Sequence, residues 1–140
     1  MIMPLETTED IRSLTAQALR DAETGFAEFA RRIEACCAAF EDGRDSNGRE
    51  ELAALAGPIG DFARFCNLVM ANCSDSLTQA SLSRMTHANH KLEHALHAVV
   101  TEAEDDNPLG IGDACRFDLA EALEDYRTLF PTMAMELDPK

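Results

Sequence analysis

The sequence predicts an all-α protein: an antiparallel four-helix bundle of up-down-up-down topology, with residues 1–140 forming a single domain. Hydrophobic residues make up 46% of the chain but aromatic residues only 6%, whereas strands are enriched in β-branched and aromatic residues. Apolar residues recur at intervals of three and four, which is the period of a helix with one buried side. Short clusters of turn-forming residues separate four such stretches, and short connections favour antiparallel neighbours.

The first helix is expected over residues 8–41 and the second over residues 49–71. The apolar side of the first helix comprises Ile11, Leu14, Ala18, Ala22, Phe26, Phe29, Ile33, Cys36 or Cys37, and Phe40. Residues 42–48 are rich in Gly, Asp, Ser and Asn, and this composition ends the helix. The second helix is predicted to be kinked near Pro58, because an internal proline lacks a backbone donor and clashes with the preceding turn.

The third helix is expected over residues 75–104, with Ser74 or Ser76 as its N-cap. Residues 105–112 then form a loop. The fourth helix is expected over residues 113–130, where Asp113 caps the start and Pro131 ends the helix. Its buried side is predicted to hold Cys115, Leu119, Ala122, Leu123, Tyr126 and Phe130.

The chain is strongly acidic, with 12 Lys and Arg against 26 Asp and Glu, for a formal net charge of −14. Such a charge repels phosphate backbones, so a nucleic-acid partner is disfavoured and a basic protein partner is favoured. No stretch approaches the ~18 consecutive apolar residues of a membrane span, and the first residues lack the pattern of a signal peptide. We therefore expect a cytoplasmic protein without a membrane span.

Five cysteines are present, an odd number without the spacing of a disulfide framework or a zinc site. On helices they are expected to act as small buried apolar residues. Cys73, at a helix joint, is expected to be the most exposed thiol. The chain carries no nucleophile elbow, phosphate-binding loop or dinucleotide fingerprint, so the sequence predicts a protein that is not an enzyme and needs no cofactor.

All four histidines lie within the predicted third helix, and we call them the histidine row: His87, His90, His94 and His97. Their intervals of three, four and three residues place them along one side of the helix, opposite its apolar side. The row is open to three interpretations: a solvated polar face, an interface with a partner or a second subunit, or a site for zinc or another divalent transition metal. One helix cannot surround an ion with four imidazoles, so a metal site needs a second helix or a second copy across a dimer interface. Unperturbed imidazoles titrate near pH ~6.5, which also predicts an oligomeric state that depends on pH.

A resemblance to known proteins is carried by residues 106–126. The segment reads Asp106-Asn107-Pro108-Leu109-Gly110-Ile111-Gly112-Asp113, followed by Phe117-Asp118-Leu119, Leu123-Glu124 and Tyr126. It resembles a recurring pattern in an uncharacterised family of small bacterial helical bundles, whose organisation is similar to flagellar export chaperones of the FliS/FliT type. The resemblance implies a non-catalytic bundle that binds another protein.

The predicted function is accordingly an adaptor or chaperone-like bundle that binds a basic or amphipathic helix of a partner protein. The mixed acidic and aromatic strip of the fourth helix is the predicted contact surface, formed by Asp113, Phe117, Asp118 and Tyr126. The alternative function is a metal-binding bundle that uses the histidine row, completed across a homodimer.

Overall fold

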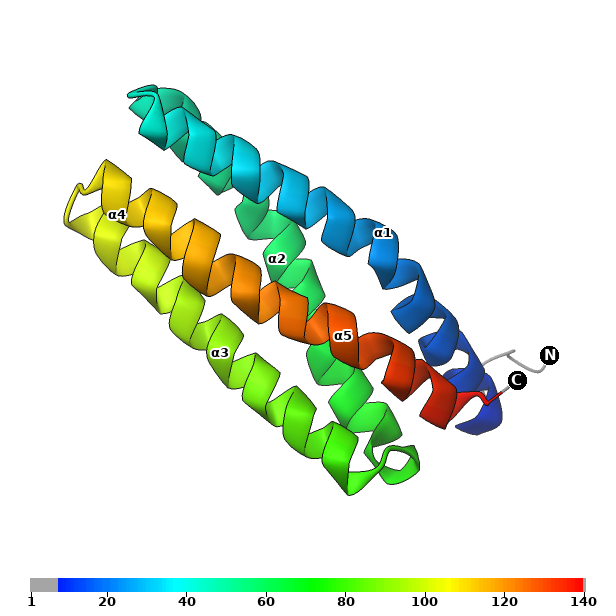
Figure 1. Cartoon of the computed structure of the whole chain (residues 1–140). Helices are drawn as coiled ribbons and strands as arrows, with labels where there is room; N and C mark the ends of the chain where they lie inside the picture. Colours follow the sequence, from blue (N-terminus) through cyan, green and yellow to red (C-terminus); the bar gives the residue numbers. More distant parts are fainter. Residues whose placement is uncertain (1–7, 140) are drawn as a thin grey trace.

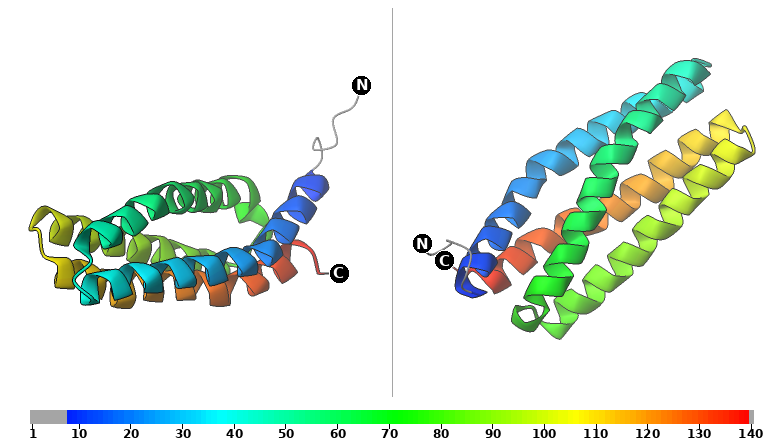
Figure 2. Two further views of the ribbon diagram at one scale, coloured as in Figure 1. Left: turned by 90° about the horizontal axis from the view of Figure 1, so that it is seen from above. Right: turned by 180° about the vertical axis from the view of Figure 1, so that it is seen from behind.

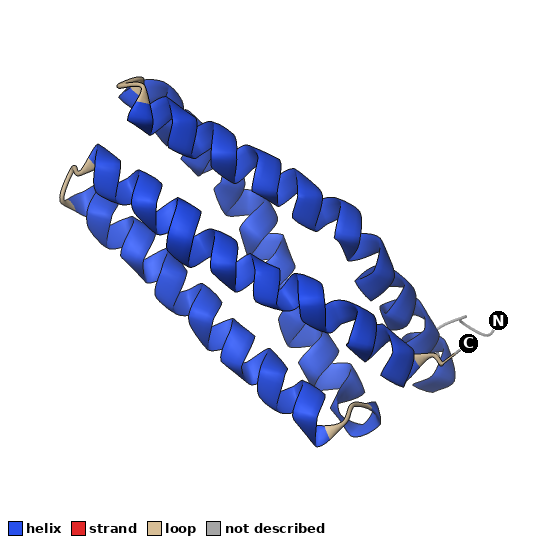
Figure 3. Cartoon of the chain, viewed as in Figure 1, coloured by secondary structure: helices blue, strands red, loops and turns tan. Residues whose placement is uncertain are grey.

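The structure, a computed structural model, describes residues 8–139. Within that range the chain forms four long helices and no strands, as the sequence predicts (Figures 1 and 3). The helices are α1 (Thr8–Glu41), α2 (Asp45–Cys73), α3 (Gln79–Glu104), and a continuous fourth helix made of α4 (Pro108–Asp113), a π-helical segment (Ala114–Leu119) and α5 (Ala120–Leu137). Neighbouring helices run antiparallel, so the predicted fold class is confirmed.

The fourth helix begins earlier than predicted. Its N-cap is Asn107, whose side-chain oxygen accepts a hydrogen bond from the backbone N–H of Gly110 at 3.3 Å. Pro108 follows at the first helical position, where its fixed φ suits a helix and its missing N–H costs nothing. The prediction that Asp113 caps this helix is therefore wrong, because an Asn-Pro pair upstream supplies a better start.

The fourth helix also continues past Pro131 to Leu137, although the sequence predicts an end at Phe130. An internal proline costs about 3 kcal/mol of helix stability. After Pro131, Met133, Ala134 and Leu137 are buried in the core. Burial of a large apolar side chain such as Met133 or Leu137 contributes about 1.5–3 kcal/mol. Tertiary packing thus outweighs the local preference.

Two further boundaries differ from the predictions. The connection after α1 is short, because Gly43 takes φ +77° and α2 already begins at Asp45. At the start of α3, Ser74–Ser76 form a 3₁₀ turn, and Thr78 is the cap, since its hydroxyl accepts a hydrogen bond from the N–H of Ser81 at 3.1 Å. The predicted caps Ser74 and Ser76 belong to that turn instead.

The second helix is one continuous element through Pro58. Its ribbon bows gently in the left view of Figure 2, and no break interrupts it. Leu55 and Ile59, on either side of the proline, are both buried. Burial of these neighbours keeps the helix intact where the local sequence disfavours it.

Aromatic side chains from three helices meet in the core. The ring of Phe62 lies 4.8 Å from that of Tyr126, and the ring of Phe26 lies 5.3 Å from that of Phe130, both pairs in edge-to-face geometry. The hydroxyl of Tyr126 donates a hydrogen bond to the side-chain oxygen of Asn89 at 2.6 Å. This cluster joins α1, α2 and α5 and connects them to α3.

The four helices do not enclose the core equally on all sides. Close backbone packing joins α1 to α2, α1 to the fourth helix, and α3 to the fourth helix. Among the long helices, the backbone of α2 closely approaches only that of α1; aromatic side chains of α2 reach α5, and the helix stands apart from α3 (Figure 2, right). Three sides of the bundle are therefore closed, and the side between α2 and α3 is open.

Candidate functional site

The open side of the bundle forms an apolar groove of about 540 Å³, which we call the α2/α3 groove. Its floor contains Leu55, Ile59 and Leu119, which are nearly or completely buried. Val100 on α3 lines the groove and is 52% exposed. The complete lining consists of Arg49, Leu52, Ala53, Leu55, Ala56, Ile59, Gly60, Ala63, Leu96, Val99, Val100, Ala103 and Leu119.

Small residues on α2 explain why this groove stays open. Ala53, Ala56, Gly60 and Ala63 follow one another at intervals of three and four, so they share one side of the helix. None of them carries a side chain that can reach across to α3. The pattern is visible in the sequence, but the separation of α2 from α3 is not, so the groove is not predictable from the sequence.

The border of the groove on α3 is acidic. Glu93, His97, Val100 and Glu104 follow one another at intervals of four, three and four, which forms a single row on the helix surface. Within residues 8–139, Glu93 and Glu104 make no ion pair. On the opposite border, Arg49 is already paired with Asp106 and Arg64 with Asp61. The unpaired charge beside the groove is therefore negative.

The histidine row lies where the sequence predicts it, on the exposed side of α3. All four imidazoles are exposed, whereas Met85, Leu92 and Val99 on the opposite side of the helix are buried. No second element completes the row, because no group of three or more His, Cys, Asp or Glu side chains within residues 8–139 is arranged to hold a metal ion. A single copy of the chain thus provides an imidazole surface.

The residues predicted to contact a partner separate into two locations. Asp113, Phe117 and Asp118 are exposed and line one pocket of about 410 Å³ where α3 meets α4, which we call the corner pocket. Phe117 is 62% exposed there. Tyr126 lies in the core and is completely buried, so its prediction as a surface residue is wrong. Nine residues separate Phe117 from Tyr126, and at about 100° per residue this spacing places them on opposite sides of the helix, which agrees with the prediction that Tyr126 belongs to the buried side.

The cysteines are unsuited to nucleophilic chemistry. All five thiols are free and buried, including Cys73, which contradicts the prediction that it is the most exposed. Burial raises the pKa of the Cys37 thiol to about 11 and that of Cys66 to about 12. The pKa of Cys115 is also raised, by its hydrogen bond to Cys36 and by burial. Because the thiolate is the reactive form, Cys37, Cys66 and Cys115 are chemically quiet at neutral pH. The hydrogen bond with Cys115 lowers the pKa of Cys36, but burial keeps that thiol away from solvent.

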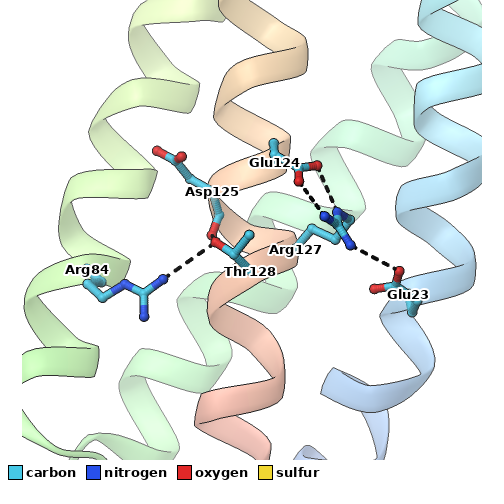
Figure 4. A network of polar contacts seen from close by, with 6 residues as sticks. All are labelled: Glu23, Arg84, Glu124, Asp125, Arg127 and Thr128. Carbon is cyan, nitrogen blue, oxygen red and sulfur yellow. Dashed lines mark hydrogen bonds and ion pairs between the residues drawn. The ribbon is translucent and has the colours of Figure 1, made fainter.

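A polar network crosses the opposite side of the bundle, between α3, α5 and α1 (Figure 4). The Arg127 guanidinium contacts Glu124 on its own helix and Glu23 on α1. Arg84 extends from α3 to the hydroxyl of Thr128 on α5 at 3.5 Å. A second polar crossing lies further along α3, where the Lys91 ammonium contacts both Asp125 and Glu121, at 2.9 and 3.0 Å.

Among residues 8–139, no helix has the combination of length and apolar character that a bilayer crossing requires. No protein-family model, no curated protein and no solved structure matches the chain.

Proposed function

We propose that this protein is a non-catalytic, adaptor or chaperone-like bundle that binds an amphipathic helix of a partner protein in the α2/α3 groove. The observation that carries the proposal is the groove itself, an apolar cavity with a volume of about 540 Å³ on the open side of the bundle. A helix that lies with its apolar side in a groove is a recurrent mode of protein recognition. The resemblance of residues 106–126 to a family of small helical bundles, whose organisation is similar to flagellar export chaperones, agrees with it.

The length of the groove indicates the length of the partner helix. The lining of α2 extends from Arg49 to Ala63, which at a rise of about 1.5 Å per residue is about 21 Å. A partner helix of about four turns would cover that length with apolar residues at intervals of three and four. It would complete the fourth side of the bundle.

The charge of the groove defines the polar side of the occupant. Glu93 and Glu104 border it without ion pairs, and the whole chain carries a net charge of −14. A partner helix with Lys or Arg beside its apolar stripe would meet these carboxylates, and complementary charge of this kind increases the rate of association and the specificity. The proposed partner is therefore a basic amphipathic helix.

The test uses two designed peptides with the same leucine stripe, one with lysine and one with glutamate on the polar side. Binding to the fluorescently labelled peptides is measured by anisotropy for the wild type, Val100→Glu and Leu14→Glu. Leu14 is the matched control, because it is an apolar residue on α1 with an exposed fraction of 54%, close to the 52% of Val100. We expect the lysine peptide to bind at least about tenfold more tightly than the glutamate peptide, and Val100→Glu alone to weaken it by about tenfold.

Three outcomes would contradict the proposal. Equal binding by Val100→Glu and wild type places the peptide elsewhere. If Asp113→Lys with Asp118→Lys abolishes binding while Val100→Glu does not, the contact surface is the corner pocket, as the sequence predicts. If sedimentation shows a homodimer that Val100→Glu dissociates, the occupant of the groove is a second copy of this chain.

A further inference from the structure

Two segments of this acidic molecule contain no acidic residues. Residues 76–92, which include the first half of α3, contain no Asp or Glu, and neither do residues 126–135 of α5. The two segments lie against each other, since Tyr126 bonds to Asn89 and Arg84 reaches Thr128. Carboxylates border this contact, since Asp125 precedes Tyr126 and Glu136 bonds to Ser81 and Thr78.

A pocket of about 310 Å³ lies between these two segments, and we call it the α3/α5 pocket. It is lined by Ser83, Arg84, His87, Asp125 and Thr128. Ser83, Arg84 and His87 stand one helical turn apart or less, so their side chains share one surface of α3. A hydroxyl, a guanidinium and an imidazole N–H are all hydrogen-bond donors.

The guanidinium of Arg84 is available to a ligand. It makes no ion pair with a described residue, and its hydrogen bond is to the neutral hydroxyl of Thr128. The neighbouring carboxylate of Asp125 contacts the Lys91 ammonium at 2.9 Å and points away from Arg84 (Figure 4). Thr128 in turn donates to the backbone oxygen of Asp125 at 3.0 Å. The Lys91 ammonium also contacts Glu121, so it offsets only part of the charge of Asp125, but most N–H groups of Arg84 remain open.

From this arrangement we infer that the α3/α5 pocket binds a phosphate group. The planar guanidinium matches two phosphate oxygens at once, and Ser83 and His87 offer donors to the others. The pocket lies on a different side of α3 from the α2/α3 groove, so the inference goes beyond the proposed function and does not depend on it. The phosphate can belong to a free small molecule or to a phosphorylated peptide, and the test separates the two.

The test is a titration of isotope-labelled protein with inorganic phosphate, followed by NMR amide shifts and compared with sodium chloride at equal ionic strength. We expect saturable shifts centred on Ser83, Arg84, His87 and Thr128. Arg84→Gln should weaken phosphate binding by about tenfold, because a charge-assisted hydrogen-bond pair is lost. Arg31→Gln is the matched control, since it removes the same charge from an exposed arginine on α1 and should leave the affinity unchanged.

A second titration uses a neutral hexapeptide that contains one phosphoserine. Tighter binding of this peptide than of inorganic phosphate supports the site and identifies a phosphorylated protein as the source. Equal or weaker binding supports the site and identifies a small molecule. Absence of saturable shifts with both probes, or equal affinities for wild type and Arg84→Gln, would overturn the inference.

Discussion

Arg32 on α1 donates a hydrogen bond to the backbone oxygen of Ala54 on α2 at 2.9 Å. In a regular helix that oxygen would accept from the N–H four residues later, but residue 58 is a proline and has none. The arginine of one helix thus satisfies the acceptor that proline leaves unpaired in the next. This contact explains how α2 stays continuous at a position where the sequence predicts a kink.

The Arg32 contact predicts coupling between Arg32 and Pro58. Arg32→Met should lower the free energy of unfolding by about 0.5–1 kcal/mol, because the Ala54 oxygen loses its donor. In a Pro58→Ala background the restored backbone N–H takes over this role, so the same substitution should cost less. Urea denaturation of the four proteins forms a double-mutant cycle. An equal cost in both backgrounds would show that the two residues act independently.

Gly48 is predicted to be irreplaceable where α2 crosses α1. A Cβ atom at this buried position would lie 2.8 Å from two carbons of the Phe40 ring. We expect Gly48→Ala to destabilise the protein by about 1–3 kcal/mol through overpacking. Gly25→Ala is the control, since nothing lies within 4 Å of its added Cβ, and it should stabilise α1 by about 0.4–1 kcal/mol. Equal denaturation midpoints for the two variants would contradict the close packing.

Glu136 is predicted to stabilise the fold at neutral pH and to lose this effect in acidic solution. Burial raises its pKa, but hydrogen bonds from the N–H of Thr78 and the hydroxyls of Ser81 and Thr78 lower it more, so the pKa falls below its ordinary value of 4.5. A lowered native pKa stabilises the fold above the ordinary pKa, and this stabilisation is lost as pH falls through the native value. Glu136→Gln should cost about 1 kcal/mol at neutral pH and progressively less below about pH 4.5. A cost that stays constant with pH would exclude the carboxylate as its source.

Because Tyr126 is buried, we expect the folded protein to lose stability in alkaline solution. Burial raises its pKa above the ordinary value of 10.0, so the unfolded chain releases this proton first and stability falls as pH rises above about 10. Tyr126 is the single tyrosine of the chain, and its ultraviolet absorbance therefore reports this ionisation alone. We expect tyrosinate to form only with unfolding, and Tyr126→Phe to flatten the alkaline decline. Ionisation near pH 10 in the folded protein would place the residue at the surface.

The buried thiols predict slow chemical modification. At about pH 8 an exposed thiol reacts rapidly because part of it is thiolate, whereas burial holds the pKa of Cys37 and Cys66 near 11 and 12. Ellman's reagent should react slowly with the native protein and rapidly with all five cysteines in urea. Rapid reaction of one equivalent in the native state would reveal an exposed thiol, and mass mapping would show whether it is Cys73.

The sequence predicts those features that depend on helical periodicity. The exposed histidine row and the buried Met85, Leu92 and Val99 follow from intervals of three and four, and these intervals hold throughout α3. Predictions based on single residues fared less well. Pro131 was expected to end a helix that core packing extends, and Asp113 was expected to cap a helix that Asn107 begins.

The α2/α3 groove lies beyond any such prediction, because it depends on the distance between two helices. Ala53, Ala56 and Gly60 would equally suit a pair of helices in very close contact. Only the arrangement of α2 against α1 shows that these small residues face open space. By contrast, the burial of Tyr126 is predicted by its place on the apolar side of its helix, and Phe117, nine residues earlier, lies on the opposite, exposed side.

The π-helical segment Ala114–Leu119 affects where the fourth helix can lose a residue. Hydrogen bonds in a π-helix join residues five apart, one more than in an α-helix, so Ala114–Leu119 set the rotation of everything that follows. Deletion of a single residue there would leave regular α-helical bonds between residues four apart, so the segment would become α-helical while Tyr126 and Phe130 stay in the core. The exposed connection at residues 42–44 can gain a residue at little cost. Elsewhere in the fourth helix, which has no loop between Pro108 and Leu137, a deletion would turn the residues that follow by about 100°.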